Sequence, residues 1–411
     1  MKPSLFVRSV TYLHIFAVAT LFFYSFTQVD LGLTIMRWQF WQKIQQSFQS
    51  IGYFNRPLST ALYGSIISLL FVSYISFLWL AMKKKIQRQY IWKVIGITTL
   101  ILFFSYNAFS YDLFNYIFDA KIVTYYQQNP YEHKALDYQN DPMLSFMHWT
   151  HRVYPYGPTW LLLSVPLSFL GIQFFLPTLL LFKALAAVSF IGSVYYIGKI
   201  YRKFLPSYEL FGIVFFGLNP LVIIESLVSA HNDIVMMFFA VMSLYLLLEK
   251  KYIFSFVMLL VSVGVKFATI FLLPTFVAFY LLARFRFSMR RKHIELVFFL
   301  TATVMIIPLL LAVNREHNFQ PWYLLFVLPF TALVARKYYI FIPIVLFSFF
   351  SLLIYAPFLY LGNWDYPVPL LIYILLAVST LLSLAAVVFY SAILFVRKKD
   401  LFADNSSEVI E

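Results

Sequence analysis

Long apolar runs without a single charged residue set the main limit on how this chain can fold. Two of them are Leu58–Met82 and Val368–Leu394. A helix of about 20 such residues crosses the roughly 30 Å hydrocarbon core of a bilayer. A helix also satisfies its own backbone hydrogen bonds, which a segment in lipid must do. The runs therefore predict membrane-spanning helices.

The composition excludes the other classes of fold. Of the 411 residues, 62% are hydrophobic and 12% are charged, whereas ordinary globular chains carry about 25% charged residues. So few charges could not cover a soluble core, and so many apolar residues exclude intrinsic disorder. Strands of a membrane β-barrel alternate in polarity over about ten residues, while these runs are continuous and longer. We therefore predict an all-α, polytopic integral membrane protein.

Hydropathy fits about twelve transmembrane helices plus one short helix. The predicted spans are Val10–Val29, Leu58–Met82, Val94–Ser110, Ile172–Tyr196, Phe211–Val228, Ile234–Leu248, Ile253–Gly264, Phe267–Leu282, Leu296–Val313, Trp322–Val334, Tyr338–Pro357 and Val368–Leu394. The apolar stretch Thr159–Leu170 is too short for a normal span, so we expect a re-entrant or interfacial helix there. No internal repeat is evident, although a repeat would have favoured a transporter.

The net charge of +14 orients the protein. Twenty-two of the 31 Lys and Arg residues lie at alternate ends of the predicted spans, in the terminal segments and in every second loop. By the positive-inside rule this face is cytoplasmic and carries both termini. Any attraction to anionic membrane lipid is secondary, and no nucleic-acid partner is expected. We predict a multi-pass protein of the cell membrane.

The chain divides into one membrane domain, 1–399, and a polar tail, 400–411, that we expect to be cytoplasmic and disordered. Residues 1–92 are predicted to form an N-terminal helix pair with an amphipathic interfacial segment at Ile35–Gln42. Residues 111–158 form the most polar part, a large extracytoplasmic loop of a length that is uncommon without a function. Cysteine is absent, which excludes disulfides and thiol nucleophiles.

Charged residues at membrane depth indicate a functional site, because burying them is costly. Asp112 lies where the third predicted span leaves the membrane, and a solvated helix end is the alternative interpretation. Asp119 follows on the same helical face. Such a pair of carboxylates can perturb each other's pKa or bind a divalent cation.

A second polar group follows Asn219-Pro220, where proline should kink an apolar span. His231, Asn232 and Asp233 form a tight polar turn after it. A helix N-cap explains one of them, but it does not explain all three together with Glu225.

Two more sets of polar residues fall on the same predicted outer side. Lys183 and Lys266 are cations in apolar surroundings, with snorkelling to the interface as the alternative. Another outer turn contains Arg315 and the run Gln320–Tyr323, whose aromatic residues could be simple interface anchors. Acid, histidine and lysine at one cavity suit general-base chemistry beside a phosphate.

Several motifs resemble C-type glycosyltransferases, which are polytopic enzymes that use polyprenyl-phosphate sugars. The likeness is greatest to bacterial polyprenol-phosphate-mannose-dependent α-mannosyltransferases. It rests on the order and spacing of Tyr111–Tyr116, Asn129–Tyr131, Tyr154–Trp160, Asn219–Leu221, Ala230–Asp233, Lys266 before Pro274, and Gln320–Tyr323. The first 90 residues lie outside this resemblance.

The resemblance implies an inverting transfer of a hexose, with mannose favoured, from a polyprenyl-phosphate donor to an extracytoplasmic lipid or glycan acceptor. Asp112 matches the family's catalytic base. Lys266 would pair with the donor phosphate, with Lys183 or Arg315 as alternatives. The residues expected to bind sugar or acceptor are Asp119, Asn115, Tyr116, Tyr156, His231, Asn232, Asp233, Gln320, Trp322 and Tyr323.

Two spans precede the one that leads to Asp112, whereas many C-type enzymes have one, so the resemblance implies an extra N-terminal helix pair. No Gly-rich phosphate loop or Walker pattern is present. The sequence requires no cofactor and no protein metal site, although a divalent cation is possible. Two alternatives stay open: a lipid-linked oligosaccharide flippase or transporter, and a polysaccharide polymerase.

Overall fold

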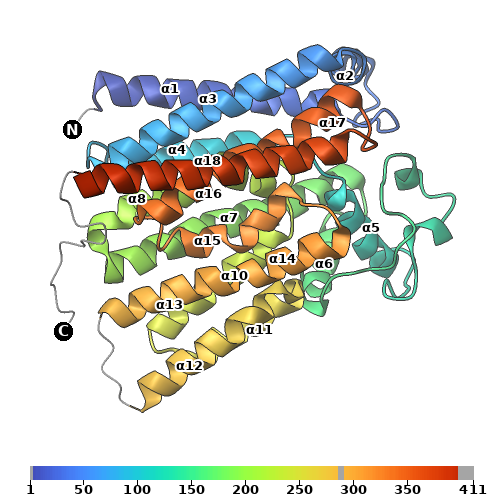
Figure 1. Cartoon of the computed structure of the whole chain (residues 1–411). Coiled ribbons are helices and arrows are strands. Elements are labelled where there is room, and N and C mark those ends of the chain that lie inside the picture. Colours follow the sequence, from blue (N-terminus) through green and yellow to red (C-terminus); the bar gives the residue numbers. More distant parts are fainter. Residues whose placement is uncertain (1–2, 286–290, 397–411) are drawn as a thin grey trace.

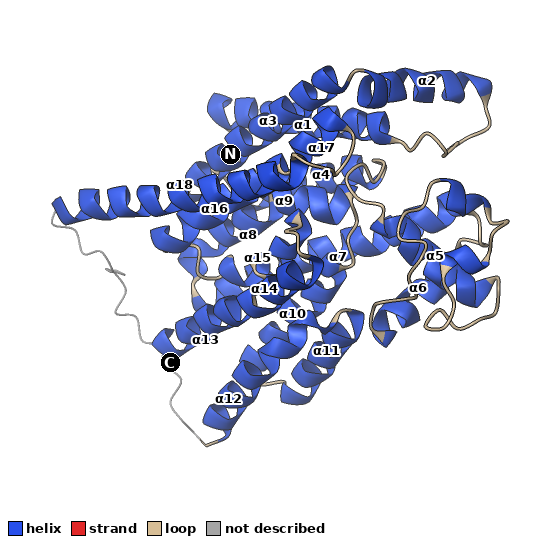
Figure 2. Ribbon diagram, turned by 45° about the vertical axis from the view of Figure 1, so that its right-hand side comes forward, coloured by secondary structure: helices blue, strands red, loops and turns tan. Residues whose placement is uncertain are grey.

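The computed structural model describes residues 3–285 and 291–396, and within these ranges it is helical with no β-strand (Figures 1 and 2). The predicted all-α class is confirmed for this part of the chain, and the predicted tail at 400–411 lies outside it. The helices are α1 Leu5–Ser25, α2 Gln39–Gln49, α3 Arg56–Met82, α4 Arg88–Phe103, α5 Asp112–Thr124, α6 Pro158–Leu170, α7 Phe175–Phe204, α8 Glu209–Gly217, α9 Pro220–Ile223, α10 Asp233–Leu248, α11 Tyr252–Val265, α12 Leu273–Arg284, α13 Arg291–Val304, α14 Ile306–Glu316, α15 Leu328–Thr331, α16 Tyr338–Leu353, α17 Tyr355–Leu361 and α18 Val368–Val396.

Seven helical segments of the described chain are long and apolar enough to cross a membrane. They are Leu5–Gln28, Arg56–Met82, Phe175–Phe204, Phe267–Arg284, Arg291–Glu316, Tyr338–Leu361 and Val368–Val396. A pair bent by 53°, Pro206–Gly217 with Pro220–Val228, brings the number to eight if it counts as one span. Three further apolar helices, α6, α10 and α11, are shorter. The chain is therefore a membrane protein, and the count of about twelve spans stays a prediction.

The predicted span Trp322–Val334 is not one continuous helix. The chain there forms a 3-10 turn at Pro321–Phe326 and the single-turn α15. Pro321 and Pro329 stand near the starts of these turns, and proline lacks the N–H that would continue a preceding helix. Most of the segment is buried inside the bundle. The prediction of a span here is therefore wrong: the apolar run reflects burial of an irregular segment inside the protein.

The bundle has two distinct ends. α1 begins and α18 ends at one, here called the termini end, while α2, α5 and α6 lie at the other, here called the loop end (Figure 1). Ion pairs tie neighbouring connections together at the termini end. They are Arg88–Glu209 at 2.9 Å, Lys203–Glu249 at 2.8 Å and Arg336–Glu295 at 2.5 Å. Basic residues from alternate loops thus meet at one end, as the charge pattern predicts.

Buried polar contacts fix the N-terminal helices within the bundle. The His14 ring of α1 is fully buried and lies 3.0 Å from the Ser73 hydroxyl of α3 and 3.1 Å from the Thr98 hydroxyl of α4. Polar contacts of this kind join helices where lipid supplies no hydrophobic driving force. The predicted helix pair is therefore α1 and α3, and α4 packs against it.

The predicted interfacial segment corresponds to α2 and the residues before it. Gln45 and Gln49 are buried and donate to the backbone carbonyls of Leu33, at 2.7 Å, and Val29, at 3.1 Å. Trp38 and Phe40 are exposed on the outside. Buried glutamines thus anchor this segment to the protein while Trp38 and Phe40 face outward, which suits the headgroup region of a membrane.

Candidate active site

The site is built around a distorted turn between α9 and α10. Asn219 caps α9 by accepting a hydrogen bond from the Leu221 N–H at 2.9 Å. The chain then widens into a π-helical turn at Ile224–Val228, and Ala230 adopts a positive φ of 53°. Such π-turns and strained residues concentrate at functional sites. Together they point His231 into the loop end of the bundle.

His231 bridges two carboxylates. Its Nδ1 lies 3.5 Å from the Asp112 carboxylate, and its Nε2 lies 3.4 Å from that of Glu225. These are ion-pair contacts longer than ordinary hydrogen bonds. The ring stacks on Trp322 with 4.2 Å between centroids, and the Tyr355 hydroxyl donates to Glu225 at 3.0 Å. His231 and Glu225 are fully buried, whereas the Asp112 side chain is 15% exposed and can meet a substrate.

The charges of this group stabilise one another. Burial acts to raise the pKa of Asp112, but nearby His231, Lys266 and Arg152 hold it below its usual value. Burial acts to lower the pKa of His231, but Asp112 and Glu225 raise it to about 9. At neutral pH Asp112 is therefore a carboxylate and His231 an imidazolium.

Lys266 is the second cation of the site. It lies at the break between α11 and the 3-10 helix Phe267–Leu272, and its ammonium group contacts the buried Asp233 at 2.8 Å. It also lies over the Phe326 ring at 5.3 Å from the centroid. Its side chain is 27% exposed. A cation fixed by one carboxylate and still reachable from outside can contact an anionic ligand.

The outer loop packs against the backbone just before this cation. The Gly157 N–H donates to the Val265 carbonyl at 3.3 Å. A Cβ on Gly157 would come within 2.2 Å of the Gly264 carbonyl oxygen, so only glycine permits the approach. The Tyr154–Trp160 motif is thereby held beside Lys266.

Aromatic residues line the wall between the loop and α5. The Tyr116 hydroxyl donates to the Asn232 side chain at 3.3 Å. The Tyr116 ring meets the rings of Tyr156 and Trp160 edge-on, each at 5.2 Å between centroids. Tyr116 and Trp160 are buried, so the partly exposed Tyr156 is the ring of this group that can pack against a sugar or an isoprenoid chain.

Asp119 belongs to the same region in a different protonation state. Burial raises its pKa to about 8, although Arg152 opposes the shift. At neutral pH this carboxyl is therefore mostly protonated and can donate a hydrogen bond as well as accept one. Its acidic neighbour on the same helix face, Asp112, is charged under the same conditions.

Many buried polar atoms in this region have no protein partner. Native proteins rarely leave such atoms unpaired, and an unbound ligand is one explanation. In the described residues they include Asn115 Oδ1, Ser226 Oγ, Ser229 Oγ, Asn232 Nδ2 and Asp233 Oδ2. They fall on α5 and on the turn that carries His231. The concentration marks this end of the bundle as the place where a polar ligand fits.

The structure does not bring every predicted residue to this cluster. Lys183 is buried elsewhere and donates to the carbonyl oxygen and hydroxyl of Ser105, at 2.5 and 2.9 Å. Arg315 is largely exposed, and its ion-pair contact is with Glu316 at 3.7 Å. The choice among Lys266, Lys183 and Arg315 for the donor phosphate stays a prediction.

The last predicted turn joins the site through one residue. Trp322 stacks on His231, and Tyr323 is buried beside it, with ring centroids 5.8 Å apart. Gln320 is half-buried and contributes its carbonyl to the turn, accepting from the Tyr323 N–H at 3.0 Å.

Three residues of the site received no role from the sequence. Glu225 was not among the expected site residues, although a charge in an apolar segment is a signal that could have added it to them. Arg152 lies in the polar loop and stacks over Trp149 at 4.7 Å, but nothing local links it to Asp112. Tyr355 resembles any aromatic residue of a late span, and only the fold shows its contact with Glu225.

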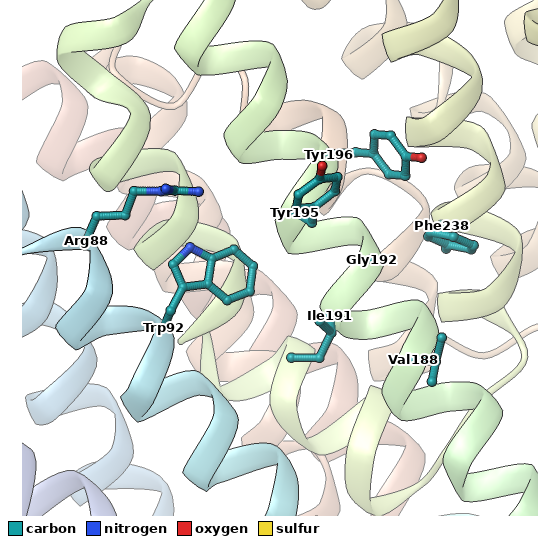
Figure 3. Close-up of a pocket in the computed structure, with 8 residues that line it drawn as sticks. All are labelled: Arg88, Trp92, Val188, Ile191, Gly192, Tyr195, Tyr196 and Phe238. Carbon is teal, nitrogen blue, oxygen red and sulfur yellow. The ribbon is translucent and has the colours of Figure 1, made fainter.

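A cavity of about 500 Å³ lies apart from this cluster, on the termini half between α4, α7 and α10 (Figure 3). Figure 3 shows Trp92 on one side of the α7 strip around Gly192, and Phe238 on the other. The lining is almost wholly apolar, and its Arg88 is paired with Glu209. None of the predicted site residues lines it. In the described residues no group of three or more His, Cys, Asp or Glu side chains is placed to hold a metal ion.

The membrane bundle and its polar loop-end cluster fit the class that the motifs suggest, the C-type mannosyltransferase-like membrane proteins. The chain belongs to the family described as alpha-(1->6)-mannopyranosyltransferase, whose N-terminal domain model matches residues 19–283. The match includes most of the N-terminal helices, which the motifs alone had left outside. No curated protein and no solved structure matches the chain. The family shows that its function is mannosyl transfer, from a sugar donor to a glycan acceptor.

Proposed function

We propose that the chain transfers mannose, with inversion, from a polyprenyl-phosphate donor to an acceptor hydroxyl outside the membrane. The observation that carries this proposal is Asp112, a partly exposed carboxylate held charged by buried His231 within 3.5 Å. A general base needs to be ionised and reachable in this way. The lipid donor explains why the site lies within a membrane bundle, because its tail can enter sideways from the bilayer.

The reaction is a displacement at the anomeric carbon. The acceptor oxygen forms a bond to that carbon while the bond from carbon to phosphate oxygen breaks. The acceptor proton moves to the Asp112 carboxylate, and polyprenyl phosphate leaves with the bonding electron pair. Holding the acceptor behind the anomeric carbon supplies much of the acceleration. The unpaired atoms of Asn115, Asn232 and Asp233 are suited to fixing sugar hydroxyls.

Lys266 is proposed to hold the donor phosphate. A charge-assisted contact of this kind contributes about 1.5–3 kcal/mol, so Lys266→Met is expected to raise the donor KM by about 10–100-fold, measured by initial rates against labelled donor. Lys266→Arg retains the charge and should recover part of the affinity. Lys43→Met, an exposed lysine of α2, is the control and should match the wild type. An unchanged donor KM in a folded Lys266→Met variant would remove Lys266 from this role.

The loop end is proposed to face the outside of the cell, with both termini cytoplasmic. The basic connections at the termini end support this orientation. The acceptor is accordingly a lipid or glycan of the cell envelope, and no nucleic acid takes part. No cofactor is proposed. Because a divalent cation could still assist at the phosphate, transfer should be measured with and without EDTA.

The test of the function gives purified protein in lipid vesicles a polyprenyl-phosphate mannose labelled in the sugar. We expect label to appear on an added α-mannoside acceptor, together with free polyprenyl phosphate. Label that crosses the vesicle without cleavage would favour the transporter alternative. Growth of long lipid-linked chains would favour the polymerase. Either outcome contradicts the proposal.

A further inference from the structure

A second cavity, with polar residues in its lining, opens at the loop end between α5, α6, α7 and the outer loop. Its volume is about 180 Å³. It is lined by Ile117, Lys121, Asp141, Pro142, Met143, Ser168, Gln173, Phe175 and Thr178. This is smaller than the 300 Å³ or so at which typical drug-sized pockets begin. A single small ring fits such a space better than an extended ligand.

This cavity is separate from the cluster around Asp112. At 100° per residue, Asp112 and Asp119 lie on one face of α5, and Lys121 lies on the opposite face. The helix is therefore the wall between the two sites, and a helix with its side chains is about 10 Å across. A ligand in the cavity would sit about one helix width from the reacting sugar.

The charged groups in the cavity cancel each other. The Asp141 side chain is almost completely buried and forms an ion pair with Lys121. It also accepts hydrogen bonds from the Tyr126 hydroxyl at 2.7 Å and the Met143 N–H at 2.9 Å. No excess charge is left for a phosphate or a metal cation. The site therefore favours a neutral ligand with hydroxyl groups.

One buried polar group has no partner in the protein. The Thr178 hydroxyl, on the first turn of α7, lines the cavity and makes no hydrogen bond, although the residue is only 2% exposed. Nearby, the Gln173 amide donates to the Thr124 carbonyl at 3.1 Å and keeps its own oxygen free to accept. A buried hydroxyl without a partner costs about 1–3 kcal/mol. A ligand hydroxyl would remove that cost.

We propose that this cavity binds one neutral hexose unit of the acceptor glycan, a unit that does not react. The inference rests on the proposed function for the identity of the acceptor. The Phe175 ring and Met143 supply an apolar wall for a pyranose face, and Thr178, Gln173 and Lys121 supply polar atoms for its hydroxyls. An acceptor several units long would then be held on both sides of α5.

The direct test is binding of α-1,6-linked mannotriose to the purified protein without donor. Thr178→Val removes the hydroxyl at nearly constant shape, and we expect affinity to fall by about 3–10-fold, the equivalent of one hydrogen bond. Thr178→Ser should bind nearly as the wild type does. Because Val relieves the unpaired group, the ligand-free Val variant should unfold at the same temperature or higher. Equal binding by Thr178→Val and wild type would overturn the proposal.

Kinetics separate this site from the catalytic one. In Thr178→Val, the KM for a mannotriose acceptor should rise while the KM for methyl α-mannoside, kcat and the donor KM stay unchanged. An equal rise for both acceptors would overturn the assignment to a distal unit. If the protein transferred no mannose at all, the proposed function would fail, yet the binding test would still report on the cavity.

Discussion

Replacement of Asp112 by asparagine is expected to abolish mannosyl transfer. The amide has the size of the carboxyl group but cannot accept the acceptor proton in the transition state. Loss of a general base costs about 10²–10⁴-fold in rate, which brings turnover near the limit of detection. The Asp112 side chain is 15% exposed, and its backbone N–H donates a hydrogen bond to the Ser110 hydroxyl oxygen at 3.1 Å. The measurement is initial transfer rate with labelled donor at saturation.

The control for this prediction is Asp137→Asn. Asp137 also lies in the outer loop, but its ion-pair contact is with the exposed His133 at 3.6 Å, so transfer should be unchanged. Both variants should elute as monodisperse protein in detergent and bind donor. If folded Asp112→Asn transferred mannose at close to the wild-type rate, another residue would have to be the base.

The sequence was most informative where charge and hydropathy conflict. A charge inside an apolar region needs a partner, so Asp112, His231, Asp233 and Lys266 were expected to converge, and the fold brings them together in pairs at 3.5 and 2.8 Å. Their roles stay predictions. The same reasoning could not choose between lysines. The Lys183 ammonium group donates hydrogen bonds to Ser105, 78 residues away. No local sequence pattern distinguishes such a lysine from one that contacts a ligand.

Other parts of the fold lay beyond the local pattern. A window of apolar residues cannot distinguish a lipid-facing helix from a buried irregular segment, so Trp322–Val334 was predicted as a span. Tyr355 reaches Glu225 from 130 residues further along the chain. Contacts of this kind follow from helix packing, which a single sequence does not encode at short range.

Replacing Glu225 by glutamine is expected to move the pH dependence of transfer without removing the base. Glu225 is one of the two carboxylates that raise the pKa of His231 to about 9. With a neutral amide in its place, the imidazole pKa should fall towards its unfolded value of 6.5. His231 would then lose its proton near neutral pH, and Asp112 would lose the cation that lowers its own pKa. Asp112 stays ionised above neutral pH, so the loss of activity there follows from the loss of the imidazolium beside it, which the proposed site uses in its charged form. We therefore expect the alkaline limb of the kcat/KM profile to shift to lower pH, with kcat near pH 6 little changed.

The same shift has a consequence for stability, with a defined sign. The folded-state pKa of His231 lies above the unfolded value, so its contribution is complete below about pH 6.5 and is lost as pH rises to about 9. The wild type should therefore unfold at lower temperature at pH 9.5 than at pH 6.5, and the difference should shrink in Glu225→Gln. Asp119, with its pKa near 8, also titrates in this window, so Asp119→Asn in the same series separates the two groups.

The kinetic prediction has its own contradicting outcome. An alkaline limb of the kcat/KM profile at the same pH in Glu225→Gln and wild type would show that Glu225 does not act through His231.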